Sequence, residues 1–412
     1  MKLKKSPADL LIYLCWLAYS ISYVGKVNYA ANITRIMDFF AVSKAEAGLA
    51  QTFFFFAYGA GQVINGLLSK KYNIKWTVFF SLVSSALLNL AVGITPDFAI
   101  VKWLWLVNGF VLSMLWPLLI RTLSESVARK SLDRANVIIS AAVACGTLLI
   151  YALSAIYTKF APFRLAFYTA TVLDLAVAIF WICAYRVGVR RAKEEKNQES
   201  AQLTVDHRED AGEETMHPRL LKVMIVFLCL FSVGINLVKD GANTWVPSIL
   251  KEEFAFDESL AIFLTLFLPL LSIVGTPLAI LVRKKIPDYV SGSALGFGLT
   301  GITLAVIMWS LQMKFAASML IGLLMVGFLA GYLNSLVVSV FPVYMRKMVN
   351  SGMIAGVLNG FCYLGSTISS YGLGYIADQR GWMAVFGVLL AFCVFACVCW
   401  VVYSLMKKRI LK

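Results

Sequence analysis

Long apolar stretches, each followed by a short polar turn, run along almost the whole chain. Each stretch holds about 20 residues, the length at which an α-helix crosses the hydrocarbon core of a bilayer. Alternating segments of about ten residues, which are typical of outer-membrane barrels, are absent. The pattern therefore predicts an all-α polytopic membrane protein. We expect twelve transmembrane helices, at residues 8–31, 45–68, 74–95, 98–124, 135–158, 165–188, 220–244, 259–283, 289–311, 315–343, 350–377 and 382–406.

One long polar tract, residues 190–219, interrupts the pattern. It is rich in Lys, Arg and Glu and almost free of aromatic residues, which is typical of a linker that is at most partly helical. Six predicted helices precede it and six follow it, which indicates an internal repeat. We predict two pseudo-symmetric six-helix bundles, at residues 1–188 and 220–412, joined by a linker at residues 189–219.

Composition and charge agree with a membrane protein. Hydrophobic residues make up 60% of the chain and charged residues 14%, well below the roughly 25% charged residues of a soluble protein. Most of the 37 Lys and Arg residues lie in the termini, the linker and the loops that share their side of the membrane. The positive-inside rule then predicts that both termini and the linker are cytoplasmic.

The distribution of Lys and Arg also indicates which partners the protein binds and in which membrane it lies. Basic residues scattered over short loops form no single basic face, so nucleic-acid binding is not expected. The net charge of +15 reflects membrane topology instead. We expect the lipid bilayer and a small anionic substrate as partners, a multi-pass protein in a bacterial cell inner membrane, and a monomer by default.

Two lysines lie inside predicted membrane spans, Lys26 in the first helix and Lys239 in the seventh. A cation at bilayer depth costs about 3 kcal/mol on insertion scales, so such residues usually face a bundle interior or a water-filled cavity. Their matching positions in the two halves indicate one anion site between the bundles. The alternative is that either lysine extends to the outer interface as an isolated cation.

Neutral polar residues recur at helical spacing around these lysines and complete the candidate substrate site. They can instead form hydrogen bonds that hold helices together. The predicted substrate-binding residues are Lys26, Lys239, Tyr23, Tyr58, Gln62, Asn236, Asn243, Asn359 and Tyr363.

No motif for catalysis, metal binding or a cofactor is present, so we predict no catalytic residue, no metal site, no cofactor and no enzyme activity. Both histidines, His207 and His217, lie in the linker. Asp174 and Asp240 are the acidic residues well inside predicted spans. A carboxyl group at that depth is the usual requirement for proton coupling.

Several segments resemble the major facilitator superfamily and, within it, the organophosphate:phosphate antiporters, which carry sugar phosphates and glycerol phosphate. The similarity covers nearly the whole chain. The matching segments are 23–28, 58–59, 66–69, 116–117, 121–122, 239–241, 245–247, 363–365, 374–378 and 381–382.

The resemblance implies two bundles that alternate access to a central site. Lys26 and Lys239 stand where the phosphate-exchanging members carry a pair of arginines. Lysine keeps the charge but lacks the planar fork that binds two oxygens at once. A phosphate ester, a sugar acid and a carboxylate all remain compatible as substrates.

We therefore predict a secondary active transporter of a small organic anion that works by alternating access and anion exchange, with one lysine from each bundle binding the anion. Two alternatives stay open. One is an organic anion symporter coupled to H⁺ or Na⁺ through Asp174 or Asp240. The other is a transporter-like sensor of sugar phosphate.

Overall fold

The computed structural model describes residues 6–68, 71–202, 217–265, 267–345, 348 and 351–411. Regular secondary structure in these ranges is entirely helical. The elements are α1 (Asp9–Ala31), α2 (Ile33–Phe40), α3 (Lys44–Leu68), α4 (Ile74–Ile94), α5 (Phe98–Ser113), α6 (Leu115–Ser126), α7 (Arg129–Tyr157), α8 (Arg164–Gln202), α9 (Pro218–Phe254), α10 (Glu258–Thr265), α11 (Phe267–Lys285), α12 (Tyr289–Gln312), α13 (Ala316–Asn334), the π-helix η2 (Ser335–Val340), α14 (Phe341–Tyr344) and α15 (Ser351–Leu411).

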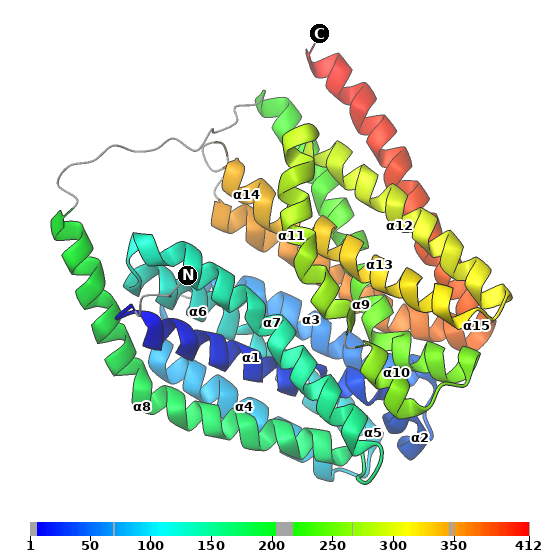
Figure 1. Cartoon of the computed structure of the whole chain (residues 1–412), viewed down its shortest axis with the longest axis horizontal. Coiled ribbons are helices and arrows are strands. Elements are labelled where there is room, and N and C mark those ends of the chain that lie inside the picture. Colours follow the sequence, from blue (N-terminus) through cyan, green and yellow to red (C-terminus); the bar gives the residue numbers. More distant parts are fainter. Residues whose placement is uncertain are drawn as a thin grey trace.

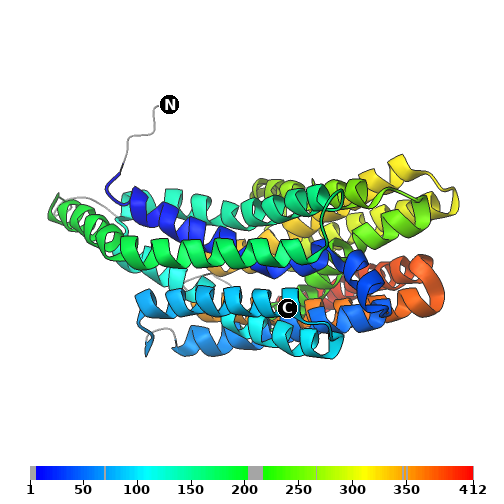
Figure 2. The ribbon, with the colours of Figure 1, turned by 90° about the horizontal axis from the view of Figure 1, so that it is seen from below.

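The helices form two bundles that lie side by side (Figure 1). The first contains α1 to α8, coloured blue to green, and the second contains α9 to α15, coloured light green to red. Turned by a right angle, the view shows helices of both bundles running along the same long direction (Figure 2). Short loops with polar caps join neighbours; for example, the Asn73 side chain accepts a hydrogen bond from the Trp76 N–H at the start of α4.

Each of the twelve predicted helices lies on observed helix, and the all-α fold is confirmed. Within the described residues, nine segments are long and apolar enough to cross a membrane, or ten with the bent α10–α11 pair. α15 counts once in that number although it is broken at Gly381, where φ is 73°. Glycine adopts this left-handed backbone without steric cost, so the chain reverses there between two passes. α3 is not among the nine because polar residues interrupt its apolar sequence. With α3, the bent pair and the second pass of α15 added to the nine, the structure is consistent with twelve transmembrane passes.

Two helices run further than predicted. α8 continues to Gln202, into the predicted linker, and α9 continues to Phe254. The polar part of α8 has i,i+4 charge pairs such as Arg190 and Glu194, which lie 3.8 Å apart and favour helix. Residues 203–216 lie outside the described residues, and the division of the chain at residues 188 and 220 stays a prediction.

The two ends of the molecule differ. Both termini and the last turns of α8 lie toward one end, which we call the terminal end; α2 and α10 lie at the opposite end, which we call the distal end (Figure 1). α3 of the first bundle packs along α15 of the second. At the distal start of α3, the backbone N–H groups of Lys44 and Ala45 donate to Asp378 of α15, at 3.2 and 2.7 Å.

Candidate functional site

Lys26 lies on the face of α1 that looks toward α3 and α15. It is buried, with 6% of its surface exposed. Its ammonium nitrogen lies 3.8 Å from the ring centre of Tyr58, 4.7 Å from that of Tyr23, 5.3 Å from that of Tyr363 and 5.8 Å from that of Phe54. A cation over an aromatic face is attracted by the ring quadrupole, most strongly where water is excluded. The side chain therefore does not extend to the membrane interface.

Lys239 and Asp240 of α9 reach the same region from the second bundle. Lys26 is attracted by Asp240 and repelled by Lys239 across the bundle interface. Neither lysine makes an ion pair within 4 Å with any residue in the described ranges. We call Lys26, Lys239 and Asp240 the central charged cluster. Its two ammonium groups remain available to an anion.

Two pairs of predicted site residues meet across the bundles. The Asn359 amide N–H donates to Gln62 Oε1 at 2.8 Å. The rings of Tyr58 and Tyr363 lie 4.9 Å apart, between α3 and α15. The Gln62 Nε2 atom is buried and has no hydrogen-bond partner within the described part of the chain. This amide can donate to a ligand oxygen.

Asn236 belongs to a short hydrogen-bond chain on α9 and α15. Its Nδ2 atom donates to Ser366 Oγ at 3.0 Å, and Ser366 Oγ donates to Asp240 Oδ2 at 2.5 Å. The Asn236 Oδ1 atom is buried without a partner among the residues described. Asn243 lies on α9 as predicted, but its side chain lies outside the described set.

Asp174 of α8 occupies a separate place behind α1. It is fully buried, so it does not lie at the lipid boundary. A Cβ atom on Gly25 would lie 2.9 Å from Asp174 Oδ2 and 2.9 Å from Asn89 Nδ2. Neither carboxyl oxygen of Asp174 has a hydrogen-bond partner in the described ranges. The first bundle thus carries a buried carboxyl group directly behind the turn that holds Lys26.

Sequence reasoning missed three contributors to this region. Phe54 and Tyr151 carry no polar pattern, yet Phe54 approaches Lys26 and Tyr151 of α7 lies within electrostatic range of Asp240. Ser366 follows Tyr363 at helical spacing, and that spacing was the signal that could have placed it in the site. Asp240 was identified only as a possible coupling or pairing residue.

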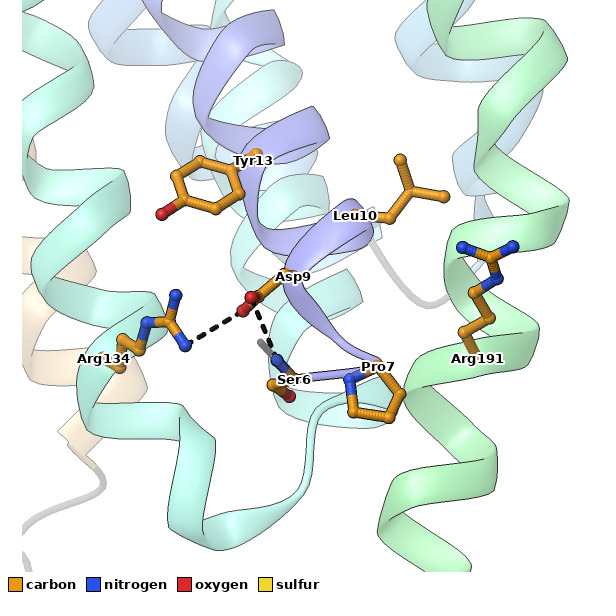
Figure 3. Close-up of a pocket in the computed structure, with 7 residues that line it drawn as sticks. All are labelled: Ser6, Pro7, Asp9, Leu10, Tyr13, Arg134 and Arg191. Atoms are coloured by element: carbon orange, nitrogen blue, oxygen red, sulfur yellow. Dashed lines mark hydrogen bonds and ion pairs between the residues drawn. The ribbon is translucent and has the colours of Figure 1, made fainter. Parts of the chain in front are cut away.

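A pocket at the terminal end is lined by a different set of residues (Figure 3). It has a volume of about 620 Å³, and Arg134 pairs with Asp9 across it at 3.0 Å. Its lining residues are Ser6, Pro7, Asp9, Leu10, Tyr13, Arg134 and Arg191. All of them belong to the first bundle or to the residues before α1, so a relative movement of the bundles would not alternate its access.

Ion pairs join the bundles at the distal end. Lys251 Nζ lies 2.8 Å from Asp38 Oδ2, and Arg35 Nε lies 3.8 Å from Glu258 Oε2. The Thr34 hydroxyl donates to Glu258 Oε1 at 2.7 Å. Burial lowers the pKa of Lys251, but the hydrogen bond to Asp38 and the attraction of Glu258 outweigh it and raise the pKa above its ordinary value. We call these contacts the distal clasp.

The fold and this cluster define a polytopic membrane protein with a charged site between two helical bundles. The sequence profile of the Major Facilitator Superfamily matches residues 15–369. The chain therefore belongs to the Major Facilitator Superfamily, and it is a transporter rather than an enzyme.

Curated relatives are similar at low identity. A "Probable hexose phosphate transport protein" of Chlamydia pneumoniae is 21% identical over 403 residues, covering 92% of this chain and 88% of the relative. "Sugar phosphate exchanger 3" of Homo sapiens is 20% identical over 386 residues, covering 82% and 76%. "Membrane sensor protein UhpC" of Escherichia coli matches 119 residues at 23% identity, which is 29% of this chain. These relatives confirm the resemblance indicated by the sequence motifs.

Solved structures share the fold. A bacterial homologue of the human lysosomal transporter Spinster, in an inward-facing and occupied conformation, matches with a TM-score of 0.77 at 12% identity and covers 98% of both chains. A D-xylose–proton symporter matches with a TM-score of 0.72 at 12% identity, covering 95% of this chain and 97% of the other. The all-α polytopic fold class is thereby confirmed, and twelve helices in two bundles are consistent with it.

Proposed function

We propose that this protein is a secondary carrier of a small organic anion, with a sugar phosphate or a related ester as the first candidate substrate. The observation that carries the proposal is that Lys26 and Lys239, one from each bundle, lie within electrostatic range of each other, without an ion pair to either within the described residues. The names of the curated relatives support a phosphorylated substrate.

The same lysines support exchange as the mode of transport. An anion held between them attracts both bundles at once, so it stabilises the state in which the bundles close around it. A ligand drives a conformational change only by such a difference in interaction between states. Without an anion, closing the site buries the two ammonium groups away from water with only Asp240 as an acid beside them. Removing charged groups from water without a full set of partners is costly, and a bound anion lowers that cost.

The test is flux into proteoliposomes that contain the purified full chain. We expect labelled hexose 6-phosphate to enter vesicles preloaded with phosphate or hexose phosphate much faster than empty vesicles. Lys26→Ala and Lys239→Ala are expected to abolish uptake, and Lys159→Ala, an exposed lysine outside the site, serves as the matched control. Equal uptake by empty and preloaded vesicles would rule out exchange.

A proton-coupled symporter is the second candidate function, because Asp174 is buried without a cation partner in the described ranges. A buried ionised carboxyl group is costly unless it is paired, so such a group favours its protonated form and can take up a proton during a transport cycle. Uptake into empty vesicles that requires an imposed proton gradient and is lost in Asp174→Asn would favour this mode. Binding of the ester without any flux would favour a sensor.

We also propose that the protein lies in a bacterial inner membrane with both termini in the cytoplasm. The terminal end then faces the cytoplasm and the distal clasp faces outward. The distribution of Lys and Arg along the chain supports this orientation.

A further inference from the structure

The central charged cluster carries an acid as well as two cations. When Lys26 and Lys239 are protonated and Asp240 is ionised, the net charge of the cluster is one positive charge. Asp174 lies behind α1, on the side of Gly25 rather than in the cluster. The site between the bundles is therefore less positive than two lysines alone would make it.

Asp240 is held in one orientation. Ser366 donates to its carboxylate at 2.5 Å, and Asn236 donates to Ser366, so a chain of hydrogen bonds fixes the acid against α15. Hydrogen bonds to an ionised carboxylate are among the stronger ones in proteins and stabilise the charged form. Asp240 is thus a fixed negative charge on the wall of the site.

The field of Asp240 reaches side chains of three helices around the site, α1, α7 and α15. It acts on Tyr23 and Lys26 of α1, on Tyr151 of α7 and on Tyr363 of α15. It also acts on Cys362 of α15, which Lys239 affects as well. The carboxylate therefore faces the space between the bundles, where it would meet the charge of a bound anion.

We propose that Asp240 sets the charge selectivity of the carrier, so that singly charged anions bind more tightly than doubly charged anions of the same shape. This inference rests on the proposed function. A ligand with one negative charge balances the cluster. A ligand with two leaves one negative charge unbalanced in a water-poor site, and Asp240 repels it. Phosphate esters would then bind as their singly ionised form.

A hexose 6-sulfate and a hexose 6-phosphate make the matched probe pair, because they share a shape and differ in charge. A phosphate ester loses its second proton near pH 6 and is mostly doubly charged at about pH 7.5. A sulfate ester is singly charged throughout this range. The ratio of their dissociation constants at pH 7.5 therefore reports charge selectivity.

The experiment measures both dissociation constants by thermal stabilisation of the purified full chain, since a ligand that binds only the folded state raises its stability by RT ln(1 + [L]/Kd). We expect wild-type protein to bind the sulfate at least about tenfold more tightly than the phosphate, because tenfold is the effect of one unit charge about 12 Å away at an effective dielectric of about 20. Asp240→Asn is expected to shift the ratio about tenfold toward the phosphate.

Two control variants separate charge from structure. Asp240→Glu keeps the charge and is expected to keep the wild-type preference. Asp257→Asn removes an acid from an exposed position at the start of α10 and is expected to leave the ratio unchanged.

A pH series on wild-type protein gives an independent readout if Asp240→Asn does not fold. Lowering the pH from 7.5 to 5.5 is expected to tighten phosphate binding relative to sulfate binding, because the singly charged ester becomes the main form. Changes in protonation of Lys26, Lys239 or the tyrosines around Asp240 alter the charge of the cluster and contribute to the ratio, whereas the comparison of wild-type and Asp240→Asn protein at pH 7.5 is made at one pH.

The outcomes are distinct. If both esters bind and the ratio is the same in wild-type and Asp240→Asn protein, or if the wild-type ratio does not change with pH, the inference is wrong while the proposed function stands. If neither ester binds nor is transported, the proposed function fails and the inference with it.

Discussion

At the scale of single residues, aromatic rings surround the buried ammonium group of Lys26. Tyr23, Phe54, Tyr58 and Tyr363 all place a ring within 5.8 Å of its nitrogen. Each such contact contributes roughly 0.5–2 kcal/mol, whereas moving an ammonium group out of water costs several kcal/mol. The rings reduce this cost without neutralising the charge, which is what a site for an exchangeable anion requires.

This balance predicts a conflict between stability and function at Lys26. Lys26→Met replaces a desolvated ammonium by an apolar chain of similar length, and we expect it to stabilise the unliganded protein by about 1–2 kcal/mol. The same substitution removes a proposed ligand contact, so anion-dependent stabilisation is expected to disappear. Melting temperatures with and without hexose phosphate measure both effects.

The exposed Lys159 provides the control for that substitution. Lys159→Met is expected to leave both melting temperatures nearly unchanged. A Lys26→Met protein that melts at a lower temperature, yet still responds to the ester, would contradict the prediction on both counts.

The sequence predicted part of the site because charge and helical spacing are visible in it. Lys26 and Lys239 stand out at bilayer depth, and Gln62 and Asn359 meet across the bundles although they are 297 positions apart. Asp240 could not be assigned in the same way. Its role depends on α1, α7, α9 and α15 meeting at one point, which no pattern within a single helix reveals.

At the scale of helices, α3 and α15 approach each other closely near the distal end. A Cβ atom on Gly374 of α15 would lie 2.7 Å from the Lys44 carbonyl oxygen of α3, and one on Gly48 of α3 would lie 2.2 Å from the Ser370 carbonyl oxygen. Both contacts involve backbone, which cannot rotate away. Only residues without a side chain allow the two helices to pack at this distance.

We predict that Gly374→Val opens this contact. The added methyl groups would collide with α3, so the bundles should separate at the distal end. A cysteine placed at Thr52, whose hydroxyl donates to the Thr367 carbonyl oxygen across the interface, should then react several times faster with a maleimide. The labelling rate of Thr52→Cys in a background without other cysteines measures the opening.

Gly372 of the same helix offers a close control, since an added Cβ there meets nothing within 4 Å. Gly372→Val is expected to leave the labelling rate of the Thr52 cysteine unchanged. Equal acceleration by the two substitutions would mean that valine acts through the helix itself and not through the α3–α15 contact.

Helix positions were more predictable than helix ends. The apolar runs located all twelve helices, because burial in lipid demands length and apolarity together. The polar extension of α8 to Gln202 was not evident, since beyond the membrane a helix depends on charge pairs and propensity instead of hydrophobic length. The break at Gly381 was placed within a few residues by the loss of the apolar pattern.

At the scale of the whole molecule, the bundles are joined through the distal clasp and along α3 and α15. The cross-bundle hydrogen bonds described above extend from Thr34 and Glu258 to Gln62 and Asn359. With the proposed orientation, the structure corresponds to a carrier closed toward the outside. The Lys251–Asp38 pair of the clasp is exposed, and an exposed ion pair contributes about 0–1 kcal/mol, so this pair adds little to the energy needed to open the clasp.

The orientation itself yields a prediction. Asp257 lies at the distal end and Lys408 near the end of α15, and both are exposed. In a variant without native cysteines, we expect Asp257→Cys to react in intact cells with a maleimide that cannot cross membranes. Lys408→Cys is expected to react only after the cells are permeabilised. The reverse result would place the termini outside.

The distal clasp also creates a surface that exists in only one arrangement of the bundles. α2 belongs to the first bundle and α10 to the second, yet Glu258 contacts both Thr34 and Arg35. An antibody fragment that recognises α2 and α10 together would bind a composite epitope. This epitope exists while the clasp is closed and is lost when the clasp opens. Such a fragment would report the conformation of the carrier in living cells, and by holding the epitope intact it would also arrest the carrier.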